Sequence, residues 1–199
     1  MFRYVPVIVA SLALAVTVQA GKFNKKLNIG DPAPVFVDLE ATDGKKYSLD
    51  SFADKDVLVV CITCNHCPVA VAYEDRIIGF VSKYCKPGGR IGFIAINVNN
   101  LEADRLPKMK ERAKAKGFNF VYAYDPSQKI GRALGASVTP EFFVFNKDRK
   151  LVYMGAMDDS MNQPKVNYLE SAVKAALAGK TAAPAETRAR GCSVKYEKK

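Results

Sequence analysis

The sequence predicts an α/β domain in which helices flank a central β-sheet. Apolar stretches of strand length alternate along the chain with segments whose apolar residues recur every three or four positions, as in helices. The chain has 199 residues, 49% of them hydrophobic, which is enough for one ordinary core. No internal repeat divides the sequence, so we expect a single domain with a sheet at its centre.

The first half of the domain contains the clearest elements. Apolar and polar side chains alternate at residues 35–39, which favours a strand, and turn residues at 42–45 allow the next segment to pair back on it as a hairpin. The continuous apolar run at 57–63 is typical of a strand buried on both faces of a sheet. A helix is expected from Pro68, because proline is tolerated in a first helical turn.

The same two patterns alternate to the end of the domain, and glycine or proline separates most of the segments. In chain order we expect strands at 35–39 and 46–49, a short helical turn at 50–52, a buried strand at 57–63, a helix at 68–84, a buried strand at 90–98, a basic helix at 107–116, a strand at 120–124, a helix at 125–134, strands at 141–145 and 151–155, and a helix at 165–178.

The first twenty residues differ from the rest of the chain. Arg3 gives a positive start, residues 5–18 are almost all apolar, and small residues precede an expected cleavage point after Ala20. The apolar run is shorter than the roughly 20 residues that span a bilayer. We therefore predict a cleaved signal peptide at 1–20, and a periplasmic or secreted protein without stable membrane insertion after cleavage. A redoxin-type domain would follow at 21–180, and a basic tail at 181–199.

The charge of the chain indicates little about its partners. The formal net charge is +10, but the lysines and arginines are scattered rather than gathered in a stripe. We interpret this as a solvated basic surface, with a weak preference for anionic membranes or acidic partners as the alternative. Export makes a nucleic-acid partner unexpected.

Cys64 and Cys67 are the most informative residues of the chain. They are two residues apart, between the strand at 57–63 and the helix that follows it. Two such cysteines form a dithiol that can close into a small disulfide ring. The unpaired N–H groups at the helix N-terminus should lower the pKa of the first thiol, Cys64, and so favour its thiolate, which is the form that attacks disulfides. The spacing therefore indicates thiol–disulfide chemistry.

Several motifs around this dithiol resemble the bacterial redoxin-type thioredoxin-like proteins, which are related to peroxiredoxins. The resemblance extends from about residue 27 to residue 196. Its motifs are Gly30–Pro34, Thr63–Pro68, Tyr73–Arg76, Thr139–Glu141 and Gly191–Lys195. It implies a thioredoxin fold, a central mixed sheet flanked by helices, with the N-terminal extension of redoxins.

The resemblance also implies roles for individual residues. Cys64 would be the exposed nucleophile, and Cys67 would resolve the mixed disulfide. Pro140 would follow a cis peptide bond and lie against the dithiol, and with Thr139 and Val138 it would bind the substrate through backbone groups. The implied partners are protein dithiols or disulfides and a redox protein that recharges the pair, and no cofactor is expected.

His66 is the only histidine of the chain and lies between the two cysteines. It could donate to the Cys64 thiolate or stabilise its charge, which would make the disulfide more oxidising. Periplasmic disulfide oxidases also have a histidine just before their second cysteine. The alternative is an exposed residue at the helix cap with little effect on the dithiol.

Three further cysteines have open roles. Cys61 extends the motif to Cys-x-x-Cys-x-x-Cys, which suggests an iron–sulfur or zinc site, but its place inside an apolar strand favours a buried core thiol. Cys85 could pair with Cys192 or remain free. Cys192 could have a second redox role of its own.

Two other functions remain possible on sequence grounds. Peroxiredoxins have a threonine three residues before the attacking cysteine, whereas here Cys61 precedes Cys64 and Cys64 precedes Cys67 at that spacing. A copper-handling protein could use Cys64, Cys67 and His66, although related copper proteins space their cysteines one residue wider and supply a distant histidine. We therefore favour an exported thiol–disulfide oxidoreductase without a bound metal.

Overall fold

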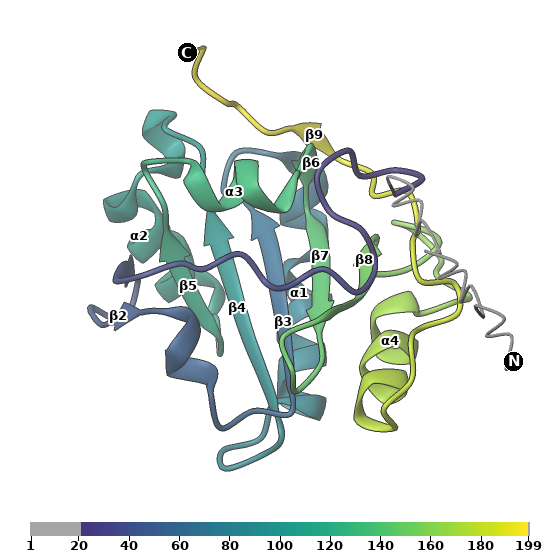
Figure 1. Ribbon diagram of the computed structural model, residues 1–199. Coiled ribbons are helices and arrows are strands. Elements are labelled where there is room, and N and C mark those ends of the chain that lie inside the picture. Colours follow the sequence, from purple (N-terminus) through teal and green to yellow (C-terminus); the bar gives the residue numbers. More distant parts are fainter. Residues whose placement is uncertain (1–20, 199) are drawn as a thin grey trace, which may run out of the picture.

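A seven-stranded mixed sheet with helices on both faces forms the centre of the protein (Figure 1). The computed structural model describes residues 21–198, so the predicted signal peptide at 1–20 lies outside the described residues. Across 21–198, no helix is both long and apolar enough to cross a membrane. The predicted α/β class, with a central mixed sheet between helices, is confirmed.

The strands follow the order β2-β1-β5-β4-β3-β7-β8, and two short strands, β6 and β9, form a separate ladder. The elements are β1 (Leu39–Ala41), β2 (Lys46–Tyr47), the 3-10 turn η1 (Leu49–Phe52), β3 (Val57–Thr63), α1 (Pro68–Tyr84), β4 (Ile91–Asn97), the 3-10 turn η2 (Glu102–Asp104), α2 (Leu106–Lys116), β5 (Val121–Tyr124), α3 (Lys129–Leu134), β6 (Val138–Thr139), β7 (Glu141–Phe145), β8 (Leu151–Gly155), α4 (Tyr168–Leu177) and β9 (Cys192–Ser193).

Strand β3 lies at the middle of the sheet, and all seven of its residues are buried. It pairs in parallel with β4, from Val57 opposite Ile91 to Thr63 opposite Asn97, and antiparallel with β7. Because β3 and β4 are parallel and in register, their carboxyl ends meet at one edge of the sheet. The loops that follow Thr63 and Asn97 are therefore neighbours.

Two apolar layers cover the sheet. Helices α1 and α4 pack on one face, where Phe80 and Val173 belong to the same core cluster. Helix α3 and the N-terminal segment pack on the other face, with Ile130 and Phe36 in the second cluster. Alternate residues of β3 enter the two layers, so the rigid centre of the protein holds the end of β3 in place.

The predicted strand at 35–39 is wrong for most of its length. Residues 35–38 carry the expected alternation, with Phe36 buried between the exposed Val35 and Val37, but they pair with no strand, and β1 begins only at Leu39. The alternation here reflects one anchoring side chain on a surface segment. The predicted return segment does pair: Tyr47 of β2 lies opposite Leu39.

Two helices begin later than predicted. Asp125 starts a turn rather than a helix, because its carboxylate accepts the N–H groups of Ser127 and Ile130, and α3 begins at Lys129. The last helix begins at Tyr168, where Asn167 caps it by accepting the N–H of Glu170. Residues 161–166, before Asn167, form bends rather than helix.

The C-terminal segment returns across the molecule after α4. In Figure 1 its yellow trace runs beside α4 and β8 and then over the carboxyl-end edge of the sheet, where β9 pairs with β6. This places the end of the chain next to the loop between β3 and α1.

Candidate active site

The two cysteines of the motif lie between the end of β3 and the start of α1. Cys67 is the N-cap of α1, and its Sγ accepts the N–H of Ala70 at 3.5 Å. Pro68 occupies the first turn, as predicted. The sulfur of Cys67 is therefore held where unpaired helix N–H groups favour negative charge.

The sulfur atoms of Cys64 and Cys67 both contact Thr139. Its hydroxyl lies 3.2 Å from the Sγ of Cys64, and its carbonyl oxygen accepts a hydrogen bond from the Sγ of Cys67 at 3.4 Å. The peptide bond between Thr139 and Pro140 is cis, as predicted. Thr139 and Pro140, predicted as site residues, thus lie at the dithiol.

Cys64 differs from its predicted description. It is only 3% exposed, so the expectation of an exposed thiol at this position is wrong. The predicted lowering of its pKa by the helix N-terminus is also wrong, because burial raises the pKa of the Cys64 thiol to about 12, despite the opposing hydrogen bond from the Thr139 side chain. In the reduced protein Cys64 is therefore held as a neutral thiol.

Cys67 carries the thiolate character instead. Burial alone would raise the pKa of its thiol, but hydrogen bonds outweigh burial and lower the pKa below its usual value. They come from the Cys192 side chain and from the backbone N–H groups of Ala70 and Cys192. The two cysteines thus have opposite protonation preferences, and the one at the helix cap ionises first.

Asp104 is a buried carboxylate beneath this loop that the sequence analysis missed. It is fully buried, and its Oδ1 accepts the backbone N–H groups of Asn65 at 2.7 Å and His66 at 3.3 Å. The side-chain amide of Asn97, at the end of β4, also donates to Oδ1, at 3.3 Å. Parallel strands that end at one edge bring their loops together, so the polar residues after β4 were the available signal.

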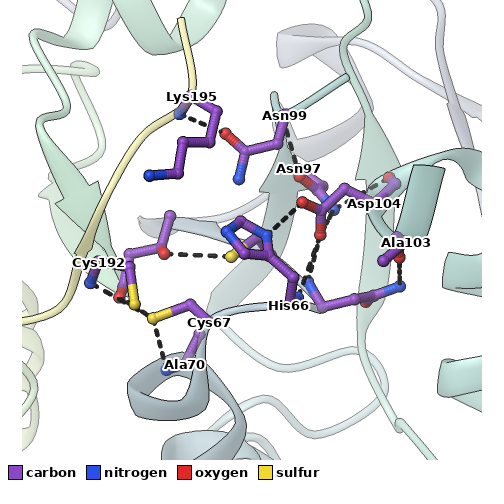
Figure 2. A network of polar contacts seen from close by, with 12 residues as sticks. His66, Cys67, Ala70, Asn97, Asn99, Ala103, Asp104, Cys192 and Lys195 are labelled. Atoms are coloured by element: carbon purple, nitrogen blue, oxygen red, sulfur yellow. Dashed lines mark hydrogen bonds and ion pairs between the residues drawn. The ribbon is translucent and has the colours of Figure 1, made fainter. Parts of the chain in front are cut away.

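His66 points at Asp104 rather than at Cys64. Its Nδ1 pairs with the Oδ2 of Asp104, while its Nε2 has no hydrogen-bond partner in the described part of the chain (Figure 2). The predicted hydrogen bond from His66 to the Cys64 thiolate is not formed in this structure. Asp104 instead fixes the imidazole beside the dithiol.

The three remaining cysteines lie in different places. Cys61 is fully buried in the core layer beneath α1, as expected for a core thiol. Cys85 is the C-cap of α1 and Cys67 its N-cap, so the 17-residue helix separates them by about 25 Å, at about 1.5 Å per residue. Since Cys192 lies against Cys67, a Cys85–Cys192 bridge is excluded in this structure.

The metal ligands considered from the sequence do not gather as one set. Within residues 21–198, the cluster with metal-ligand spacing consists of Cys64, His66 and Asp104, whose ligand atoms lie within 4.8 Å of one another. Cys61 and Cys67 are not part of it. Moreover, both oxygens of Asp104 already accept hydrogen bonds. The donor set therefore differs from the one expected for copper.

A cavity of about 280 Å³ opens beside the dithiol. Val69 of α1 and Pro140 form the wall nearest to the cysteines, and the remainder is lined by Tyr73, Ala156, Met157, Asp158, Asp159, Ser160, Met161 and Arg190. The cavity therefore combines apolar side chains with two carboxylates and one guanidinium.

The backbone edge expected to bind substrate is occupied by the chain itself. In the β6–β9 ladder, Val138 lies opposite Ser193 and Thr139 opposite Cys192. The last strand thus covers the dithiol, and Cys67 has no exposed surface. Sequence patterns did not reveal this pairing, since each strand has only two residues.

The fold and the site define a thioredoxin-fold protein with a dithiol at the start of its first helix. The Redoxin family model matches residues 28–173, which is most of the chain. The chain therefore belongs to the redoxin family. No curated protein matches it.

The chain is also similar to solved structures. A hypothetical protein from Sinorhizobium meliloti is 31% identical with a TM-score of 0.80, over 88% of this chain and 98% of that one. A conserved protein from Geobacillus kaustophilus is 30% identical with a TM-score of 0.79, over 86% and 94%. A thiol:disulfide interchange protein of the thioredoxin family from Chlorobium tepidum is 21% identical with a TM-score of 0.53, over 66% and 89%, and supports the fold alone.

Proposed function

We propose that this protein is an exported thiol–disulfide oxidoreductase that exchanges electrons with protein substrates through Cys64 and Cys67. One observation carries the proposal: at the N-terminus of α1, the Sγ atoms of Cys64 and Cys67 both contact Thr139. Family membership and the cavity beside Val69 support it. Its partners are protein dithiols or disulfides and a second redox protein that recharges the pair; nucleic acid has no part in it.

The opposite protonation preferences of the two thiols suggest the order of steps. The Cys67 thiolate attacks a substrate disulfide, forming a mixed disulfide and releasing one substrate thiolate. Cys64 then loses its proton and attacks the Sγ of Cys67, which closes the Cys64–Cys67 disulfide and releases the second substrate thiolate. Two electrons pass from the dithiol to the substrate, and the reverse sequence oxidises a substrate dithiol.

Asp104 and His66 are the polar groups positioned to handle the proton of Cys64. Their ligand atoms lie within 4.8 Å of one another and of the Cys64 sulfur. A proton that leaves Cys64 in the second step would pass to this pair. Asp104 also holds the loop of Asn65 and His66 through two N–H groups, which keeps the cysteines in place.

The test is the reduction potential of the Cys64–Cys67 pair in glutathione buffers. Cys85 and Cys192 are replaced by serine, and Cys61 by alanine, because a serine hydroxyl at this fully buried position would lack a partner. We expect a reversible disulfide. A potential of about −120 mV would indicate an oxidase, and a potential of about −270 mV would indicate a reductase. Failure to form the disulfide would overturn the proposal.

The same preparation tests the two alternatives. A peroxidase would attack peroxide with the Cys67 thiolate, the same sulfur that the proposed exchange uses. Peroxide consumption at a rate matching disulfide exchange would favour that function. Stoichiometric zinc or copper in the purified protein, lost in a Cys64→Ser variant, would favour a metal-handling protein.

A further inference from the structure

Strand β9 places a third thiol against the dithiol. The N–H of Cys192 donates to the Sγ of Cys67 at 3.3 Å, although the two residues are 125 positions apart (Figure 2). Figure 2 shows the side chain of Cys192 directed toward the same sulfur. Because Thr139 is opposite Cys192 in the β6–β9 ladder, this cysteine stands where a substrate strand would present its own.

The segment around Cys192 is anchored along its length. Lys195 donates its N–H to Asn99 at 2.7 Å, and its carbonyl oxygen accepts from Gln128 at 2.9 Å. The side chain of Val194 is buried, and the hydroxyl of Tyr196 donates to Ala136 at 2.8 Å. The Cys192 thiol is therefore held in position rather than carried on a loose end.

Gly191 sets how closely the strand approaches. A Cβ atom at this position would lie 1.9 Å from the carbonyl oxygen of Thr139, a backbone atom that also contacts Cys67. Only glycine permits this approach. A glycine at position 191 is therefore required for the β6–β9 pairing that places Cys192 at the dithiol.

From this juxtaposition we infer that Cys192 is a third redox residue, which takes over the disulfide from Cys64. The Cys192 thiol gives up its proton, and its sulfur attacks the Sγ of Cys67 in the Cys64–Cys67 disulfide. The Cys67–Cys192 bond forms and the Cys64–Cys67 bond breaks. Cys64 leaves as a thiolate and takes up a proton, so one disulfide and one thiol exist before and after, and no external oxidant enters the step.

The pKa shifts of the three thiols support this exchange from Cys64 to Cys192. In the reduced protein, hydrogen bonding to Cys67 raises the pKa of Cys192, together with burial. Once the Cys67 sulfur is part of a disulfide it carries no negative charge, so this cause disappears and Cys192 becomes a better nucleophile. The high pKa of Cys64 keeps the displaced residue as a thiol.

The inference rests on the proposed function and extends it. The exchange produces a form in which β9 is covalently tied over the edge that a protein substrate would use. Oxidising equivalents are then stored in a closed state, and a substrate gains access only after the bond to Cys192 is exchanged or reduced.

The experiment uses a Cys64→Ser variant of the purified protein, oxidised with glutathione disulfide, quenched in acid and mapped by mass spectrometry without reduction. We expect most chains to contain a Cys67–Cys192 link. Adding Gly191→Ala should slow its formation at least tenfold. A matched Gly79→Ala control, at a helix position where an added Cβ meets nothing within 4 Å, should leave it unchanged.

A parallel Cys192→Ser variant separates the inferred role of Cys192 from the proposed exchange through Cys64 and Cys67. If it forms the Cys64–Cys67 disulfide while the Cys64→Ser variant forms no Cys67–Cys192 link, the role of Cys192 is overturned and the proposed function stands. If neither disulfide forms, the proposed function fails. Should Cys64→Ser not fold by circular dichroism, the unaltered protein is mapped instead, and absence of the Cys67–Cys192 link there overturns the inference.

Discussion

Asp104 and His66 bind each other across the gap between two strand ends. The Oδ2 of Asp104 contacts the Nδ1 of His66, while its Oδ1 accepts the N–H of Asn65 at 2.7 Å. Asp104 follows β4 and His66 follows β3, so a buried carboxylate joins the two loops at the carboxyl-end edge of the sheet. The position of the dithiol depends on this link as well as on α1.

Replacing Asp104 with alanine should reduce both stability and exchange. The variant leaves buried donors without an acceptor, a loss of about 1–3 kcal/mol in the free energy of unfolding. Asp104→Asn keeps one acceptor oxygen, so it should retain most of the stability but lose the carboxylate oxygen that pairs with His66. The pH profile of disulfide exchange separates the effect of Asp104 on stability from an effect on proton transfer. A profile of Asp104→Asn identical to that of the unaltered protein would rule out a role in proton transfer.

Cys192→Ala should raise the pKa of Cys67. Hydrogen bonds from the side chain and N–H of Cys192 are among the causes that lower it, and the substitution removes the side-chain donor. Titration of the thiolate by ultraviolet absorbance, in a background without Cys61 and Cys85, measures the change. Ser193→Ala is the control, since Ser193 is exposed. An unchanged titration in Cys192→Ala would contradict the pairing of the two thiols.

Stability should fall in alkaline solution. Burial raises the pKa of Cys64 and of Cys85 to about 12, and it also raises the pKa of Tyr122 and Tyr153. The unfolded chain releases these protons from about pH 8.5 for cysteine and about pH 10 for tyrosine. Above about pH 9 the unfolded state therefore binds fewer protons than the folded state, and the free energy of unfolding decreases as pH rises.

Urea midpoints at neutral pH and near pH 10 measure this loss. A Cys85→Ala variant is the internal comparison, because it removes one of the thiols whose pKa is raised. Its midpoint should decrease less between the two pH values. Equal midpoints for the unaltered protein at both pH values would show that these groups ionise normally in the fold.

Arg112→Ala should destabilise the contact between α2 and α1. The guanidinium of Arg112 donates to both oxygens of Glu74, at 2.8 and 2.7 Å, and the Glu74 side chain is 8% exposed. Removing Arg112 leaves this carboxylate buried without its partner. The expected loss is about 1–3 kcal/mol, below the value for a fully buried pair because Arg112 is partly exposed.

Two further variants on α2 calibrate that measurement. Arg112→Lys keeps the charge but not the two-pronged geometry, so it should lose an intermediate amount. Lys116→Ala removes an ion pair with the exposed Asp75, which should cost about 0–1 kcal/mol. A loss for Lys116→Ala equal to that for Arg112→Ala would mean that burial of Glu74 adds nothing.

Local sequence patterns predicted the centre of the fold well. The bounds expected for 57–63, 68–84, 141–145 and 151–155 are those of β3, α1, β7 and β8. A strand buried on both faces, or a long amphipathic helix, leaves a repeated signal in its own residues. Residues 35–38 show the limit of this approach: one buried Phe36 between exposed neighbours produces the alternation of a strand without a partner strand.

The site was less predictable because its key contacts join distant segments. The motif located Cys64, His66 and Cys67, and the resemblance indicated Thr139 and Pro140. Neither pointed to Asp104, which has no neighbouring motif and acts through backbone N–H groups of another loop. The pairing of β6 with β9 leaves no periodic pattern, since two residues per strand are too few.

The position of β9 has a consequence for the order in which the protein is made. A ribosome releases the chain from its N-terminus, and domains begin to fold during synthesis, at about 5–20 residues per second. Cys67 and the helix that it caps therefore emerge well before β9, the strand that covers them, because Cys192 follows Cys67 by 125 positions. Until β9 has emerged and paired with β6, the reactive thiols of the nascent chain have no strand over them.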